Sequence, residues 1–217
     1  MYRLYGRPGS GSVAIEAILE AAGEPYEVEL IERSSDGKAP SEKLARLNPL
    51  GQVPVLVLPD GTVMTESAAI ALYLADTHRE ADLAPPPASA ERAPYLRWMV
   101  YLATNVYMTG LAAYYPDRYT SDQVGGKCVK SAALNRMARE WDIYAQALGD
   151  KPYILGDKMS AADIYAAMQA TWNFDVPAFF KKHPNLRAMY NRVTAHPAIA
   201  KVWGRNEMED WKYCLKS

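Results

Sequence analysis

The stretch Val53–Glu66, "VPVLVLPDGTVMTE", decides the fold, because it contains two short apolar runs separated by a turn. The turn, Pro59-Asp60-Gly61, is a strong signal for a tight connection between two strands. A connection this short joins antiparallel neighbours, whereas parallel neighbours need a long crossover. The stretch therefore predicts an antiparallel hairpin.

Upstream of this hairpin the chain has the pattern of strand, helix and strand. Residues 2–5 (YRLY) and 26–32 (YEVELIE) are typical of strands, and residues 12–22 have apolar side chains on one side at helical spacing. A further helix is predicted at residues 67–78, directly after the hairpin. We therefore predict the order βαβ, an irregular or helical connection, and ββα.

The second part of the chain is predicted to be helical. The stretch LAPPPASAER interrupts the pattern, because consecutive prolines cannot continue a helix and favour an extended linker. Beyond it, strand signals nearly vanish. The sequence thus predicts an α/β domain at 1–79, a linker at 80–90 and an all-helical domain at 91–217. One helix start is well specified, with Ser160 as N-cap and Asp163 three residues later.

Composition and charge argue against several classes of partner. The 217 residues carry 24 basic and 25 acidic side chains with no long run of either sign, which leaves no electrostatic footprint for nucleic acid or an anionic membrane. No apolar run approaches the roughly 18 residues of a membrane span, and no signal-peptide pattern is present, so we expect a cytoplasmic protein. No metal is expected, because His78, His183 and His196 lack metal-ligand spacing.

The glycine-rich turn after the first strand superficially matches two phosphate-binding motifs. Gly6 and Gly11 have phosphate-loop spacing, but Ser12 stands where that motif needs lysine. A dinucleotide fingerprint begins at Gly9, but the hairpin downstream is incompatible with the all-parallel sheet of that fold. The remaining interpretation is that Ser10 or Ser12 opens a helix, where free N–H groups favour an anion such as a thiolate. Capping alone would explain these serines equally well.

At this point three motifs resemble those of the glutathione transferase superfamily: NPLGQVPVL at 48–56, TESAAI at 65–70 and GDKMSAADI at 156–164. The resemblance spans essentially the whole chain and is to bacterial, serine-type members related to the theta, zeta and beta classes. It implies a thioredoxin-like N-terminal domain with a cis-proline, a helical-bundle C-terminal domain, and a homodimer that acts in detoxification. It also implies glutathione as co-substrate, with no metal.

By resemblance, six residues contact glutathione: Gln52, Val53, Pro54, Glu66, Ser67 and Lys38. A cis bond before Pro54 would let the Val53 main chain pair with the cysteinyl unit, like an added strand. Ser67 at a helix N-terminus suits the carboxylate of the γ-glutamyl group, and Glu66 suits its ammonium. For the glycine carboxylate, Lys38 is offered only by its position near the NPLG motif, and surface charge would explain it equally well.

By the same resemblance, the catalytic residue is Ser10 or Ser12; we favour Ser10, and the sequence leaves both open. Counting from the first strand favours Ser10, whereas counting back from the helix favours Ser12. In either case the serine is a hydrogen-bond donor to the thiolate of glutathione, because only the thiolate is nucleophilic and a free thiol near pKa 8.5 is mostly protonated. The glutathione sulfur then attacks an electrophilic carbon.

The predicted pocket for the electrophile uses five residues of the helical domain: Tyr107, Met108, Tyr114, Tyr115 and Trp172. Each residue taken singly is also typical of a helical core. We favour a glutathione transferase acting on small hydrophobic electrophiles. The alternatives are a glutathione-dependent peroxide or disulfide reductase of the same fold, and a non-enzymatic binding module that keeps the fold.

Overall fold

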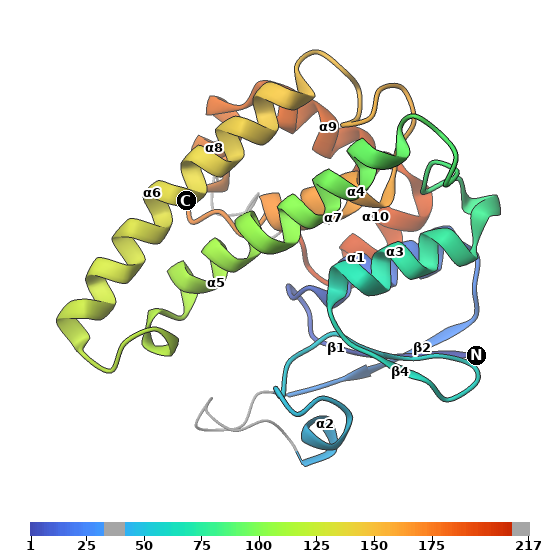
Figure 1. Cartoon of the computed structure of the whole chain (residues 1–217), viewed down its shortest axis with the longest axis horizontal. Helices are drawn as coiled ribbons and strands as arrows, with labels where there is room; N and C mark the ends of the chain where they lie inside the picture. The colour runs from blue at the N-terminus through green and yellow to red at the C-terminus, as the bar shows by residue number, and fades with distance from the viewer. Residues whose placement is uncertain (33–41, 210–217) are drawn as a thin grey trace. The chain divides into compact units, whose positions relative to one another are not determined.

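The computed structural model describes residues 1–32 and 42–209. These residues form two compact units, of which the first contains residues 1–32, 42–85 and 193–209, and the second contains Pro86–Arg192 (Figure 1). This grouping differs from the sequence-based division, which assigned everything after residue 90 to the helical domain. The difference arises because the last helix, α10 (Pro197–Arg205), packs against α1 (Ser12–Ala21) of the first unit.

A four-stranded sheet in the order β2-β1-β3-β4 supports the first unit. Its strands are β1 (Tyr2–Gly6), β2 (Tyr26–Leu30), β3 (Val55–Val57) and β4 (Val63–Met64). β1 pairs with β2 in parallel and with β3 in antiparallel, and β3 pairs with β4 in antiparallel. The predicted βαβ start and the predicted hairpin are therefore confirmed. A mixed sheet of this kind also confirms the rejection of a dinucleotide-binding fold.

Helices cover both faces of this sheet. Figure 1 shows α1 and α3 (Ser67–Thr77) over one face and α2 (Glu42–Leu47) over the other. α2 closes its face with Leu44, which packs with Tyr5 and Val55 in a buried apolar cluster. The short 3-10 helix η1 (Arg79–Ala81) follows α3. The first unit thus has the predicted thioredoxin-like architecture.

The second unit is helical, as the sequence predicted, which confirms the α/β plus all-α fold class. Its elements are α4 (Arg92–Tyr101), the π-helix η2 (Leu102–Tyr107), α5 (Met108–Tyr114), the 3-10 helix η3 (Pro116–Arg118), α6 (Gln123–Leu148), α7 (Ala161–Ala170), α8 (Val176–Lys182) and the part of α9 (Pro184–Ala195) up to Arg192. Helix α8 was not anticipated, although Asp175 followed by Pro177 is a helix-start signal. Asp175 does cap it, since its carboxylate accepts a hydrogen bond from the Ala178 N–H at 2.9 Å. No helix among the described residues is long and apolar enough to span a bilayer.

The predicted capping box at the start of α7 is confirmed. The Asp163 carboxylate is fully buried and accepts hydrogen bonds from the Ser160 N–H at 2.9 Å and the Ser160 hydroxyl at 2.7 Å. It also accepts one from the Ile154 N–H at 2.8 Å. Burial raises the pKa of Asp163 to about 6, while these hydrogen bonds favour the ionised form. Asp163 therefore has a structural role in joining the loop before α7 to the helix.

Candidate active site

Three segments singled out from the sequence meet at one end of the sheet. Tyr5, near the end of β1, pairs with Val55 at the start of β3, so the turn after β1 lies near the Val53-Pro54 bond. Because β4 runs antiparallel to β3, the pair Glu66-Ser67 that follows β4 returns to this same end. The topology therefore gathers the serine turn, the proline bond and the start of α3 at one sheet end.

Two serine hydroxyls close the turn between β1 and α1. Ser12 Oγ accepts a hydrogen bond from the Arg7 N–H at 3.0 Å, and Ser10 Oγ donates to the Arg7 carbonyl at 2.7 Å. Ser12 is only 3% exposed, and a Cβ on Gly6 would come within 2.6 Å of its Oγ. Ser10 is only partly buried. The structure thus packs Ser12 into the fold and leaves Ser10 the more accessible of the two.

The Arg7 carbonyl, which accepts a hydrogen bond from the Ser10 hydroxyl, also lies within hydrogen-bond distance of the Ser12 hydroxyl. The Ser10 and Ser12 hydroxyl oxygens lie 2.9 Å apart, and the Ser12 hydroxyl also lies within donating distance of the Arg7 carbonyl, at 3.1 Å. The Ser10 hydroxyl can therefore rotate toward a ligand without leaving that carbonyl unpaired. The first turn of α1 carries no acidic residue, so no side-chain charge there offsets the positive end of the helix dipole.

The bond before Pro54 is cis, which confirms the expectation from the family resemblance. The turn that precedes this bond is closed by hydrogen bonds of the Asn48 side chain, and Asn48 is 5% exposed. Asn48 Nδ2 donates to the Gln52 carbonyl at 2.9 Å, and Asn48 Oδ1 accepts from the Leu50 N–H at 3.1 Å. The sequence analysis quoted the NPLG motif but assigned Asn48 no role. An asparagine followed by proline was the available signal for such a side-chain-closed turn.

The start of α3 has an unusual backbone conformation. Glu66 is exposed and has φ +63°, which is uncommon for a residue with a Cβ and costs free energy. Ser67, the first residue of α3, is 8% exposed. Conformations of this kind occur preferentially where a ligand is held. The remaining predicted contact, Lys38, lies outside the described residues.

Four of the five residues predicted for the electrophile pocket, Tyr107, Tyr114, Tyr115 and Trp172, form an aromatic cluster in the second unit. The rings of Tyr107 and Trp172 meet edge to face at 4.9 Å, and the Tyr114 hydroxyl donates to the Trp172 carbonyl at 2.7 Å. Tyr115 lies 6.4 Å from Tyr114, measured between ring centroids, and Met108 is 47% exposed. Tyr107 ends the π-helix η2, a rare geometry that is frequent at functional sites.

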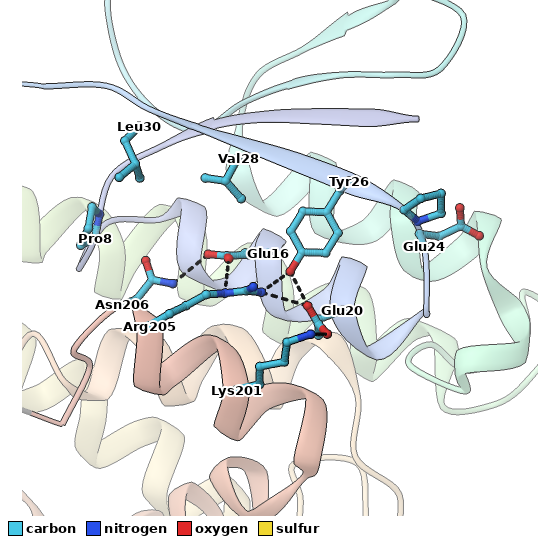
Figure 2. Close-up of a pocket in the computed structure, with 11 residues that line it drawn as sticks. Pro8, Glu16, Glu20, Glu24, Tyr26, Val28, Leu30, Lys201, Arg205 and Asn206 are labelled. Atoms are coloured by element: carbon cyan, nitrogen blue, oxygen red, sulfur yellow. Dashed lines mark hydrogen bonds and ion pairs between the residues drawn. The ribbon is translucent and has the colours of Figure 1, made fainter.

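A pocket of about 570 Å³ lies in the first unit, lined by α1, β2 and the end of α10 (Figure 2). The buried Glu16 carboxylate pairs with Arg205 Nε at 2.7 Å and accepts from Asn206 Nδ2 at 2.8 Å. Glu20 pairs with Lys201 at 2.5 Å and with Arg205 at 2.9 Å. Burial raises the pKa of Glu16, whereas the hydrogen bond from Lys201 helps to lower that of Glu20 to about 2. We call Glu16, Glu20, Lys201, Arg205 and Asn206 the α10 clasp, because the four charged side chains pair with one another and Asn206 donates to Glu16.

Comparisons with known proteins match both parts of the chain. A family profile described as "Glutathione S-transferase, N-terminal domain" matches residues 12–77, and one described as "Glutathione S-transferase, C-terminal domain" matches residues 103–197. The GST-like protein YncG of Escherichia coli (strain K12) is 35% identical over 208 residues, which cover 96% of this chain and 100% of that protein. The chain belongs to the glutathione S-transferase family.

Solved structures agree with this assignment. A glutathione transferase homologue from Sulfitobacter, with bound glutathione, is 26% identical with a TM-score of 0.86, over 94% of this transferase and 98% of that chain. A glutathione transferase from Methylococcus capsulatus str. Bath is 28% identical with a TM-score of 0.81, over 96% and 100% of the two chains. The resemblance inferred from the sequence motifs is thus confirmed, and the protein is a glutathione transferase.

Proposed function

We propose that this transferase binds glutathione at the sheet end described above and that the Ser10 hydroxyl holds the glutathione thiolate for attack on small hydrophobic electrophiles. The pair of serine hydroxyls at the start of α1 is the observation that carries this proposal. Ser10 is the more accessible, while Ser12 is buried and bonded to the Arg7 main chain. The glutathione bound to the Sulfitobacter homologue supports the choice of ligand.

The Ser10 hydroxyl activates the thiol by favouring its charged form. A hydrogen bond to a charged group contributes about 1.5–3 kcal/mol. Since one pKa unit corresponds to about 1.4 kcal/mol, this bond lowers the thiol pKa by about 1–2 units. The N-terminus of α1 acts in the same direction. Ser12 then works as a positioning residue: its hydroxyl accepts from the Arg7 N–H and, together with the Ser10 N–H, keeps the Arg7 carbonyl paired when the Ser10 hydroxyl turns toward sulfur.

The other parts of glutathione fit the remaining segments at this end of the sheet. The Val53 main chain is free of the β3 ladder and pairs with the cysteinyl unit as an added strand would. The Glu66 carboxylate binds the γ-glutamyl ammonium, and Ser67 at the start of α3 binds the neighbouring carboxylate. Gln52, which is exposed, adds side-chain hydrogen bonds. Lys38 stays the predicted partner of the glycine carboxylate.

The reaction forms a bond between the glutathione sulfur and an electrophilic carbon. The sulfur donates an electron pair to that carbon, and a leaving group departs with the pair it previously shared. The aromatic cluster around Tyr107 and Trp172 supplies apolar surface suited to such substrates. A homodimer, a cytoplasmic location and a role in detoxification stay predictions that follow from the family.

The proposal is tested first by binding and turnover. Glutathione is titrated into the protein by calorimetry, and conjugation is followed with a generic aryl halide. We expect saturable binding and conjugation above the uncatalysed rate. Binding without conjugation, combined with turnover of a hydroperoxide, would instead favour the reductase, and no binding at all would favour a non-enzymatic module.

The role of Ser10 is tested by the pKa of bound glutathione, measured from the pH dependence of thiolate absorbance. Ser10→Ala is expected to raise this pKa by about 1–2 units. Ser12→Ala is the matched control, because it removes a hydroxyl only two residues away, and a smaller rise is expected. A rise confined to Ser12→Ala would exchange the two roles, and no change in either variant would contradict thiolate stabilisation by serine.

A further inference from the structure

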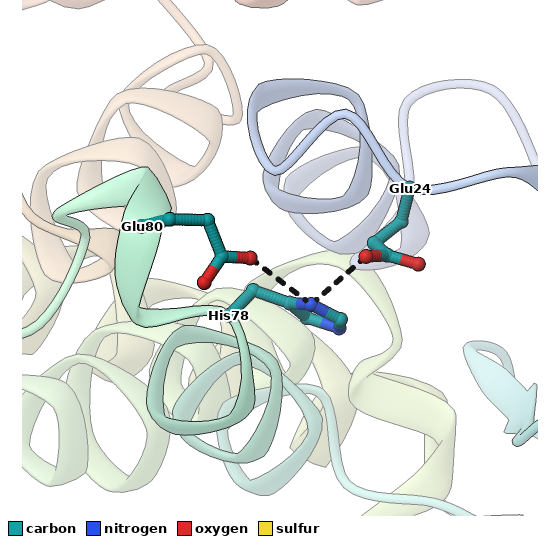
Figure 3. A group of neighbouring side chains, drawn as sticks. All are labelled: Glu24, His78 and Glu80. Carbon is teal, nitrogen blue, oxygen red and sulfur yellow. Dashed lines mark ion pairs between the residues drawn. The ribbon is translucent and has the colours of Figure 1, made fainter.

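Three side chains with metal-binding atoms converge in the first unit, away from the serine turn. Glu24 lies beyond the end of α1, His78 directly follows α3 and Glu80 lies in η1 (Figure 3). One ligand atom from each lies within 4.8 Å of the others. His78 Nδ1 is 3.1 Å from the nearer Glu24 oxygen and 3.6 Å from the nearer Glu80 oxygen.

The His78 ring is held in a fixed orientation by a residue outside this group. His78 is 8% exposed, and its Nε2 lies 2.9 Å from the hydroxyl of Tyr2, which is itself 4% exposed. The two rings meet edge to face with centroids 5.7 Å apart. When Nε2 carries the proton and donates to Tyr2, the lone pair of Nδ1 is directed toward the two carboxylates. Metal-binding histidines are characteristically oriented by such a partner on the second ring nitrogen.

The spacing and charge of the group suit one divalent ion. Ligand atoms about 2.0–2.2 Å from a tetrahedral ion lie about 3.3–3.6 Å from one another. The observed distances from His78 Nδ1 are 3.1 and 3.6 Å, and the two carboxylate oxygens lie within 4.8 Å of each other, so side-chain movements bring the set to this spacing. Two carboxylates with a neutral imidazole carry a charge that a divalent cation neutralises. A mixed nitrogen and oxygen set favours Zn²⁺ or Mn²⁺ over Mg²⁺, which prefers oxygen ligands alone.

We propose that Glu24, His78 and Glu80 form a binding site for a divalent transition-metal ion, with Tyr2 as the positioning residue for His78. The Glu80 side chain is 70% exposed, so the ion is open to solvent on that side and completes its coordination with water. The site is distinct from the proposed glutathione site, because His78 and Ser67 flank opposite ends of α3, about 16 Å apart along the helix axis. Its role is to join the segments that follow α1 and α3.

Metal binding is tested with the full chain, freed of any histidine tag and treated with chelator. Zn²⁺, Mn²⁺ and Mg²⁺ are titrated separately by calorimetry, and the Zn²⁺-loaded protein is studied by X-ray absorption. We expect one Zn²⁺ per chain, a single imidazole among nitrogen and oxygen ligands, and a rise in melting temperature with Zn²⁺. With one equivalent of Zn²⁺ bound and unbound Zn²⁺ removed, so that none coordinates the glutathione thiol, the pKa of bound glutathione should be unchanged. Absence of saturable Zn²⁺ binding would overturn the proposal.

Single substitutions test whether Zn²⁺ binds at the group of Glu24, His78 and Glu80. Glu80→Gln changes an exposed side chain and is expected to weaken Zn²⁺ binding about tenfold or more, and Tyr2→Phe about tenfold through loss of ring orientation. His196→Gln is the matched control, because His196 is exposed and lies outside the group. Zn²⁺ binding that is lost in His196→Gln, or unchanged in both Glu80→Gln and Tyr2→Phe, would show that these side chains form only an ion-paired cluster.

Discussion

The two ends of α1 use polar side chains in opposite ways. At its N-terminus, Ser10 and Ser12 are uncharged, and the first turn carries no acidic residue. Further along, Glu16 and Glu20 are charged and their carboxylates are paired with cations of α10. The first end has the Ser10 hydroxyl, which can rotate toward a ligand. The carboxylates of Glu16 and Glu20 instead form ion pairs that hold α10 against α1.

This difference shows how one helix serves two purposes. A buried carboxylate such as Glu16 is tolerated only with a partner, so its ion pair fixes α10 in place. Hydroxyls cost less to bury and can exchange partners, so they suit a position where a ligand comes and goes. The variants below are designed to break one end of α1 without the other.

The largest effect is expected at the α10 clasp. Arg205→Met leaves the Glu16 carboxylate, whose side chain is 5% exposed, without its ion pair, and should cost about 3 kcal/mol in free energy of unfolding. Lys201→Met is the matched control, because the Lys201 side chain is 62% exposed, and should cost less than about 1 kcal/mol. Urea unfolding measures both values. Equal losses would show that burial of Glu16 does not set the strength of the clasp.

At the other end of α1, Ser12→Ala is expected to cost about 1–2 kcal/mol in free energy of unfolding, because the Arg7 N–H loses its acceptor. Ser10→Ala should cost less, since the Ser12 hydroxyl still reaches the Arg7 carbonyl. The same urea experiment measures both. If Ser10→Ala were the more destabilising, Ser10 rather than Ser12 would be the structural member of the pair.

Acid should weaken the clasp through Glu20. Its pKa is lowered from 4.5 to about 2 in the folded protein, so the unfolded chain takes up a proton first. Its contribution is therefore complete above pH 4.5 and is lost as the pH falls toward 2. Because solvent reaches Lys201, we expect this contribution to be about 1 kcal/mol. Hydrogen exchange of α10 amides against pH, in wild type and Glu20→Gln, should differ above pH 4.5 and converge near pH 2.

The smallest stability effect is expected at Glu66. Glu66→Gly relieves the cost of φ +63° and should raise the free energy of unfolding by about 0.5 kcal/mol, after the extra entropy of glycine in the unfolded chain is subtracted. Its affinity for glutathione should fall roughly fivefold, the loss expected of one exposed ion pair. Glu66→Gln separates the two effects, because it should weaken binding without a gain in stability. Unchanged affinity in both variants would remove Glu66 from the proposed site.

Local sequence signals predicted most of the fold. The hairpin at Val53–Glu66, the strand and helix before it, and the capping box of Ser160 and Asp163 are confirmed because each depends on residues close together in the chain. Helix α8 was missed although its Asp175 cap was visible. The π-helix η2 interrupts a stretch whose helical spacing gave no sign of an interruption.

The motifs around Val53 and Glu66 predicted segments that the structure brings to one end of the sheet. Counting along the chain could not separate Ser10 from Ser12. In the folded chain Ser12 is buried, whereas Ser10 is only partly buried. This difference in exposure depends on the residues that pack against the turn. The same limit applies to residues 193–209, which belong to the first unit and form ion pairs with α1.

By itself, the sequence determined the order of strands and helices and the family to which the chain belongs, because both can be recognised from short runs of neighbouring residues. Only the tertiary structure decided which serine is accessible, that α10 is held by Glu16 and Glu20, and that His78 lies between Glu24 and Glu80. The physical reason is that burial and charge pairing depend on groups far apart in the chain. Glu24 and His78 illustrate this, since they lie far apart in the sequence and meet only in the folded chain.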